Sequence, residues 1–151
     1  MSQLGPFPVS SVIDRLRLRA PVLKLVGDAA DLDTALAQEP RVDVAAYVTI
    51  YEQGRQIKYL GSVAQQNCDV TLRIVLFTRH YGSQETGSGA RQVMDAEVIP
   101  EVRGALFGWT PDDAFNALSF AAGRDERYRA GWLVTQQIFT TDYRLSHQVQ
   151  P

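Results

Sequence analysis

Residues 42–51, VDVAAYVTIY, alternate between apolar and mixed positions. The even positions, Val48 among them, are all valine, alanine or isoleucine, whereas the odd positions include Tyr47 and Tyr51. Successive side chains of a β-strand point to opposite faces of a sheet, so this pattern predicts a strand with one buried face. The other face carries aromatic and polar side chains.

A second pattern of period two runs from about Val63 to Thr78 and contains Leu72 and Ile74. Together the two patterns predict neighbouring antiparallel strands. The connection between them, Glu52–Tyr59, is polar and has few apolar residues, so we expect a loop with little local reason to be ordered.

Apolar residues at helical spacing occur in the sequence both before and after these two strands. An amphipathic segment begins near Ser10 and ends at Pro21, and it buries Leu16. The longest helical pattern, Ser88–Phe107, places apolar residues at every fourth position. Pro100 lies inside it, and an interior proline costs about 3 kcal/mol, so we expect a kink or a break there. The apolar stripe of this segment is Met94, Val98, Val102 and Leu106.

The end of the chain predicts a closing hairpin, with Ala117–Ala122 before a turn at Gly123–Asp125 and a strand at Tyr128–Thr140. The order of elements predicts an α+β fold in a single domain, residues 1–151, with a mostly antiparallel or mixed sheet of about four to five strands and helices on one face. The alternative is that helices cover both faces. The expected core consists of Leu16, Val48, Leu72, Ile74, Val102, Leu106, Trp109 and Trp132.

Composition removes several classes of function. The formal charge is −2 in 151 residues and no cluster of lysine and arginine stands out, which argues against a dedicated nucleic-acid binder. Cys68 is the only cysteine, and His80 and His147 lie in unrelated contexts. We therefore expect no disulfide, no metal site, no cofactor and no catalytic residue. The longest apolar runs are too short to span a bilayer, so no membrane partner is expected.

The basic residues comprise 13 arginines and only 2 lysines. Arginine and aromatic residues are enriched in protein interfaces and lysine is depleted there, although a GC-rich genome would produce the same bias. We interpret the mixed sheet face and the polar loops Glu52–Tyr59 and Tyr81–Gly89 as contact surfaces. The candidate interface residues are Tyr47, Tyr51, Arg55, Tyr59, Arg73, Arg79 and Arg91.

Three features carry a resemblance to a known family. The opening helix has Val12, Ile13 and Leu16, the first strand has Ala46-Tyr47-Val48, and the later segment 103–111 reads RGALFGWTP before the closing strand Trp132–Phe139. In this order and spacing the chain resembles the tail terminator proteins of tailed bacteriophages, including prophage-encoded ones.

The resemblance implies a virion structural protein, assembled in the host bacterial cytoplasm, whose copies form a ring, usually a hexamer. Such a ring stops growth of the tail tube at its head-proximal end and offers its other side to the neck or head completion protein. The implied partners are further copies of the chain, the tail tube protein, the neck protein and, in a contractile tail, the sheath protein. DNA passes through the lumen without specific binding.

Two other functions remain open at this point. A neck or head-tail joining protein would share ring closure but would not bind the end of the tube. A small enzyme or ligand-binding α+β domain would need a deep pocket with convergent polar groups near His80 or Arg91.

Overall fold

A single mixed sheet forms the centre of the molecule. The computed structural model describes residues 3–80 and 88–150. The strands lie in the order β1-β2-β4-β6-β5, and β3 pairs with one end of β4. This is the α+β fold with a mostly antiparallel sheet that the sequence predicts. The bounds are β1 Leu25–Gly27, β2 Val44–Gly54, β3 Lys58–Leu60, β4 Val63–Arg79, β5 Ser119–Arg129 and β6 Trp132–Gln148.

The longest pairing joins β4 and β6, which run antiparallel from Val63 opposite Gln148 to Arg79 opposite Trp132. Strand β2 pairs antiparallel with the other edge of β4, from Val44 opposite Thr78 to Gly54 opposite Cys68. The predicted antiparallel neighbours are therefore adjacent. Strand β1 adds a short parallel pairing at the β2 edge.

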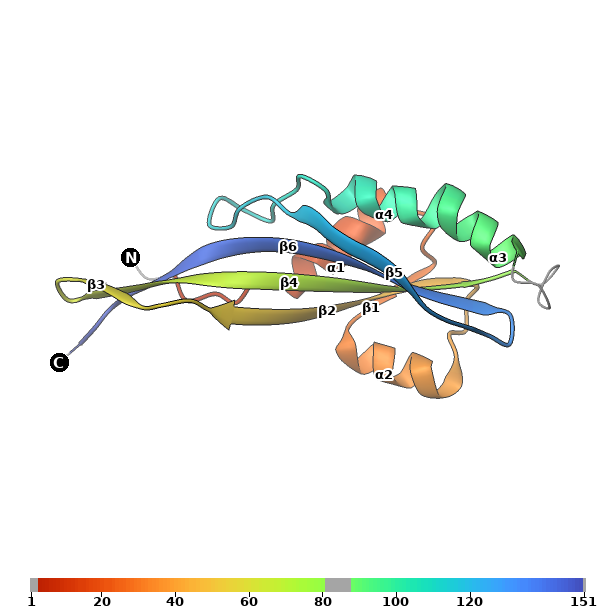
Figure 1. Cartoon of the computed structure of the whole chain (residues 1–151), viewed down its shortest axis with the longest axis horizontal. Helices are drawn as coiled ribbons and strands as arrows, with labels where there is room; N and C mark the ends of the chain where they lie inside the picture. The colour runs from red at the N-terminus through yellow and green to blue at the C-terminus, as the bar shows by residue number, and fades with distance from the viewer. Residues whose placement is uncertain (1–2, 81–87, 151) are drawn as a thin grey trace.

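One face of the sheet is covered by α1 (Val9–Arg19), α3 (Ser88–Val93), η2 (Met94–Val98) and α4 (Ile99–Leu106), as Figure 1 shows. The last three follow one another without a loop, so Pro100 does not break the helical path. It lies in the first turn of α4, directly after the π-helical turn η2, so the departure from regular α-helical hydrogen bonding falls at the junction of the two elements. The predicted stripe, Met94, Val98, Val102 and Leu106, is fully buried.

The remaining helix, α2 (Ala29–Gln38), lies on the opposite face of the sheet (Figure 1). Asp28 accepts from the backbone N–H of Ala30 and Asp31, and the Asp31 carboxylate accepts from Asp28 N–H, which forms a capping box. The buried residues of α2 pack on Tyr47 and Phe77. Helices therefore cover parts of both faces. The expectation that they lie on one face holds for α1, α3, η2 and α4, which we call the larger helix group, but not for α2.

The closing hairpin turns later than expected. The predicted turn at Gly123–Asp125 lies inside β5, and the actual turn is Ala130-Gly131, between paired Arg129 and Trp132. Both turn residues have positive φ, 54° and 84° respectively, as a two-residue type I′ hairpin requires. The register shifts twice within β5, which accommodates the polar segment that sequence reasoning took for a turn.

Most of the expected core residues lie beneath the larger helix group and are at most 1% exposed: Leu16, Val48, Leu72, Ile74, Val102 and Leu106. Trp132 is also buried, but it packs beneath α2 on the other face. Trp109 differs from the expectation: it is only partly buried, at the margin of the core, with the Arg15 guanidinium 5.5 Å from its ring centre.

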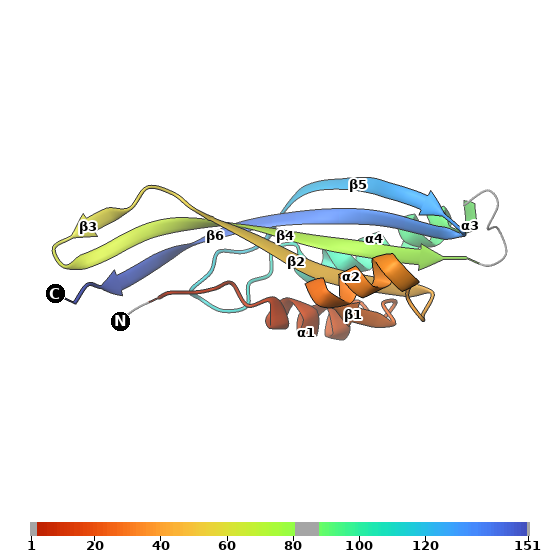
Figure 2. The same ribbon diagram turned by 90° about the horizontal axis from the view of Figure 1, so that it is seen from below.

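The far end of the sheet extends past the helices as a narrow ribbon (Figures 1 and 2). We call residues 55–67 and 144–149 the arm. It contains β3, the first part of β4 and the last part of β6. The expectation of a loop at Glu52–Tyr59 is therefore wrong at both ends, because β2 continues to Gly54 and β3 begins at Lys58. Backbone pairing to β4 orders this polar segment, although few of its side chains are buried.

The stripe of the longest helical segment gives a direct test of the core. Leu106→Ala should lower the free energy of unfolding by about 2 to 5 kcal/mol, because its side chain is fully buried. The matched control is Phe107→Ala, one residue further on and 66% exposed, which should change stability by at most about 0.5 kcal/mol. Urea denaturation followed by circular dichroism measures both values, and equal losses would contradict the assigned packing.

Candidate assembly surfaces

The second face of the sheet is only partly covered by α2. Beyond this helix, Arg73 projects from the middle of β4 and is exposed. Its neighbours across the strands are Thr49 on β2 and Ile138 on β6. Tyr51, one pair further along the same face, is 62% exposed. The structure therefore brings two candidate interface residues, Tyr51 and Arg73, to one open and mainly polar part of the sheet.

Tyr47 belongs to the same face but is not available for contacts. It is 2% exposed, and its ring meets Phe77 edge-on at 5.4 Å between ring centres. Burial, together with the nearby charge of Asp31, raises the pKa of the Tyr47 hydroxyl. The expectation that Tyr47 lies at an interface is corrected: α2 covers the half of the sheet face on which it sits.

Arg79 is held within the subunit. Its guanidinium lies 5.7 Å from the ring centre of Trp132 and 4.0 Å from the Glu39 carboxylate, and its side chain is 24% exposed. A planar cation stacked on an indole is a favourable arrangement that also shields the ring. Arg79 thus closes the small core beneath α2 and presents little surface to a partner.

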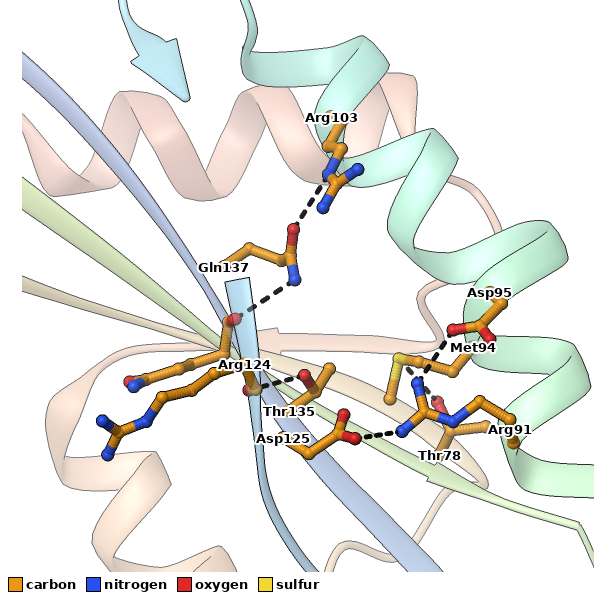
Figure 3. A network of polar contacts seen from close by, with 10 residues as sticks. Thr78, Arg91, Met94, Asp95, Arg103, Arg124, Asp125, Thr135 and Gln137 are labelled. Atoms are coloured by element: carbon orange, nitrogen blue, oxygen red, sulfur yellow. Dashed lines mark hydrogen bonds and ion pairs between the residues drawn. The ribbon is translucent and has the colours of Figure 1, made fainter. Parts of the chain in front are cut away.

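Arg91 joins the helices to the outer strand β5, as Figure 3 shows. It donates to Asp95 on η2 at 2.9 Å and to Asp125 on β5 at 2.5 Å. These bonds raise the pKa of Arg91, and the bond from Arg91 lowers the pKa of the Asp125 carboxyl. The arginine predicted at an interface, or beside a ligand pocket, is instead occupied by two carboxylates of its own chain.

A second link between helix and sheet was missed by sequence reasoning. Arg103 on α4 donates to the side-chain oxygen of Gln137, which is 2% exposed (Figure 3). The Arg103 guanidinium also lies 4.4 Å from the Phe120 ring centre. Gly123 leaves room for this glutamine, because an added Cβ would lie 2.6 Å from its Nε2. A glycine and a glutamine on opposed strands are the only sequence signals of this contact.

The arm carries the remaining candidates. Arg55 pairs with Asp69 at 2.7 Å, and Tyr59 is 64% exposed on β3. Arg55 lines one hollow together with Asp69 and Thr71, and Thr71 is the residue paired with Tyr51 of the open patch. The loop Tyr81–Gly89 lies outside the described residues except for Ser88 and Gly89, which begin α3.

A partly buried carboxylate at the base of the arm was also missed. Glu52 accepts from Phe7 N–H at 2.7 Å and from the Tyr143 hydroxyl at 3.0 Å. Burial and this acceptor raise the pKa of Tyr143, and burial raises the pKa of the Cys68 thiol, which lies 3.8 Å from Glu52. The cluster fastens the N-terminal segment to the sheet and keeps the cysteine as an unreactive thiol.

Within residues 3–80 and 88–150, no group of three or more histidine, cysteine, aspartate or glutamate side chains could hold a metal ion. Among the helices of the same residues, none combines the length and apolar character that crossing a bilayer requires. Four candidate contact residues remain exposed: Tyr51 and Arg73 lie on the open sheet face, and Arg55 and Tyr59 lie on the arm. Exposed arginine and aromatic residues of this kind are typical of surfaces that bind other proteins.

The comparisons with known proteins identify the family of this chain. The model of the phage tail terminator protein family matches residues 2–149, and the chain belongs to that family. It is therefore a structural protein of the virion tail, built to assemble with other phage structural proteins.

A chain of the solved structure described as "Virion of native gene transfer agent (GTA) particle" has the same fold, with a TM-score of 0.55 and 18% sequence identity. The likeness covers 89% of this chain and 92% of that one. No curated protein matches.

The Arg91–Asp125 pair predicts a pH-dependent contribution to stability. Because the pKa of Asp125 is lowered in the folded state, the pair stabilises the fold above the usual Asp pKa of 3.8 and the contribution is lost as the pH falls through the lowered value. Asp125→Asn should therefore cost up to about 1 kcal/mol at pH 7, since both side chains are partly exposed, and nothing once Asp125 is protonated. Urea denaturation across pH measures this, with Asp113→Asn as the control; a loss independent of pH would contradict the assignment.

Proposed function

We propose that this protein is the terminator of the phage tail tube, forming a hexameric ring at the head-proximal end. The ring binds the last ring of tube protein and stops further addition. Its other side is the attachment surface for the neck or head completion protein, and in a contractile tail it also meets the end of the sheath. Family membership over residues 2–149 supports this proposal.

The observation that carries the self-association step is the outer edge of β5. All eleven residues of this strand are exposed, and within residues 3–80 and 88–150 it pairs along one side only, with β6. An edge strand of this length presents a row of unpaired N–H and C=O groups, which proteins usually cover or interrupt with charges. Charges protect Arg124–Arg129, whereas Ser119–Gly123 has none. The uncharged part of the edge is suited to a neighbouring copy.

Ring closure requires a heterologous contact, in which one surface of a copy meets a different surface of the next and the same rotation is repeated. The open patch around Tyr51 and Arg73 supplies an aromatic ring and a guanidinium, the groups most enriched at interfaces. The proposal therefore keeps Tyr51 and Arg73 as contact residues and adds β5.

Termination is steric and needs no reaction. A ring that matches the tube end on one side, and lacks the surface that accepts another tube ring on the other, stops polymerisation once it is bound. The groups that could act as a nucleophile or an anion site, Cys68 and Arg91, are engaged within the subunit. We therefore assign the protein no enzymatic activity.

The charge of the chain suits a passage for DNA. With a net charge of −2, the subunit lacks the cationic excess that holds a phosphate backbone. A ring of such subunits lets the genome pass through its lumen without specific contacts.

The test of assembly is imaging of the purified protein, alone and with tail tubes, by negative-stain electron microscopy. Rings of uniform diameter are expected, and each should occupy one end of a tube and prevent elongation. Rings that never bind tube ends would favour a neck protein instead, and a uniformly monomeric protein in the presence of tubes would contradict the proposal.

Arg73→Glu should leave the subunit folded, because Arg73 is exposed, and should reduce ring formation by reversing a charge on the open sheet face. Arg19→Glu, at an exposed position in the last turn of α1, is the matched control. Sedimentation velocity measures the fraction of rings for both variants. Unchanged ring formation by Arg73→Glu would remove Arg73 from the interface.

A further inference from the structure

Two stretches of strand at opposite edges of the sheet lack a further backbone partner among residues 3–80 and 88–150. One is Ser119–Gly123, the uncharged part of the outer edge of β5. The other lies on β2, because β1 pairs only with Ala45–Tyr47 and leaves the outer side of Val48–Gly54 uncovered. Unpaired N–H and C=O groups on an exposed edge are a template for pairing with a strand of another chain.

The two stretches lie at the same level along the sheet. Thr140 on β6 pairs with Ser119 on one side and with Thr71 on the other. Thr71 pairs in turn with Tyr51 on β2. Directly opposite residues of neighbouring strands project from the same face of a sheet. One row of hydroxyl side chains therefore crosses the open face and reaches both edges.

The limits of the two stretches also coincide. When the pairs are followed in the same way through Gln136 and Val75, Arg124 falls in the row of Tyr47. Arg124 is the first charged residue of β5, and Tyr47 is the last residue of β2 that β1 covers. The uncharged part of one edge thus spans rows that are free on the other, and charges begin where β1 closes the other edge.

The strand directions allow these edges to pair between copies. Each of the pairs β2–β4, β4–β6 and β6–β5 is antiparallel, so β5 and β2 run in opposite directions. Placing β5 of one copy beside β2 of the next, with the same face outward, therefore continues the antiparallel alternation. In a ring whose axis runs along the strands, successive copies are related by rotation alone, so equal rows meet. Equal rows also keep each side chain on its own face.

The side chains that meet in this register are compatible. In Ser119–Gly123 every side chain except that of Phe120 is small. Tyr51, which is 62% exposed, comes opposite Ser119 and has room for its ring. Phe120 is 38% exposed and belongs to the row of Ile50, which is partly buried. An aromatic residue opposite a β-branched one is a favourable cross-strand pair.

Pairing between copies ends at Gly123, because β1 of the next copy occupies the place beside Tyr47. The register of β5 shifts between Phe120 and Ala122 and again between Asp125 and Arg127. Such bulges bend a strand, which lets β5 leave the contact. The charged side chains from Arg124 onwards protect the part of the edge that stays unpaired.

We propose that Ser119–Gly123 of one copy adds as an antiparallel strand to Val48–Tyr51 of the next copy, with Ser119 opposite Tyr51. The occupant of each free edge is a second copy of this chain. The inference rests on the proposed ring and specifies the contact that builds it. Because the β5 edge of each copy meets the β2 edge of another, the contact is heterologous and leaves one edge of each kind free until the ring closes.

Disulfide crosslinking between two variants, each with one introduced cysteine, tests the pairing. Ser119→Cys lies on β5 and Tyr51→Cys on β2, both at exposed positions. Opposite residues of antiparallel strands have Cβ atoms roughly 4.5–5.5 Å apart, close to the span of a disulfide. The native Cys68 is 3% exposed and stays in both chains. One variant carries a mass tag, so that a mixed disulfide is identified on a non-reducing gel after the two are assembled together and oxidised.

The control pairs Ser119→Cys with Phe107→Cys, at a residue that is 66% exposed. The mixed disulfide is expected with Tyr51→Cys and at background level with Phe107→Cys. Phe107 lies close to the start of β5, because the N–H of Gly108 donates to the Leu118 carbonyl at 2.8 Å. A two-fold contact between two β5 edges would therefore raise crosslinking at Phe107→Cys, so the control also detects this alternative.

Ala121→Lys tests the edge contact without a crosslink. Ala121 is exposed and lies at the first register shift, outside the pairs of β5 with β6, so the subunit should stay folded. A lysine on an edge opposes strand addition, so the fraction of rings measured by sedimentation velocity should fall several-fold. Ala114→Lys, at an exposed alanine outside the strand, is the matched control and should leave that fraction unchanged.

Negative-stain images of the same samples separate this inference from the proposed function. Rings without the Tyr51–Ser119 crosslink, rings with equal crosslinking at Phe107→Cys, or rings unaffected by Ala121→Lys would overturn the edge pairing and leave the terminator ring in place. Crosslinked chains that form open filaments would support the pairing and contradict the ring. Absence of rings and of crosslinks would overturn both proposals.

Discussion

The antiparallel pairing of β4 with β6 is the constraint on which the rest of the structure depends. At one end this pair carries the larger helix group on one face and α2 on the other, and at its other end it continues together with β3 into the arm. Because side chains alternate between faces, one register sets both cores at once. A slip of the pairing by one residue would turn Leu72 and Ile74 to the open face and Arg73 towards the core. The burial of side chains on both faces therefore fixes the register.

The sequence was most informative where the apolar period was long. The stripe from Met94 to Leu106 and the alternation around Val48 and Leu72 predicted the helix layer and the central strands, because each pattern reports burial against one face. The second core was not predicted as a separate core: Tyr47 was taken for an interface residue, and Trp132 was expected in the core without an assigned face. The ring of Tyr47 resembles that of an interface residue until α2 is seen to cover it, and the sequence of a ten-residue helix does not indicate which face of a sheet the helix will cover.

Candidate site residues were harder to place than the core, for a physical reason. The sequence does not indicate whether an arginine contacts another protein or a side chain of its own chain. Only the fold shows that Arg91 pairs with Asp95 and Asp125. The same holds for Arg79, which lies over the ring of Trp132. Arg73 and Tyr51 are exposed because they lie beyond the part of the sheet that α2 covers. The segment Glu52–Tyr59 was taken for a loop because backbone pairing, rather than side-chain burial, orders it, and backbone pairing leaves no hydrophobic pattern.

The distribution of polar contacts separates what must stay rigid from what is left for partners. Arg91 and Arg103 fasten the helix layer to β5, and Glu52 fastens the N-terminal segment at the base of the arm. Beyond that base no buried residue holds the ribbon. The outer strand is thus tied to the helices by side-chain contacts, whereas the arm is held by backbone pairing and by the bridge between Gln3 and Ser146. A partner that binds the arm must therefore restrict exposed side chains that no local packing holds, which costs conformational entropy.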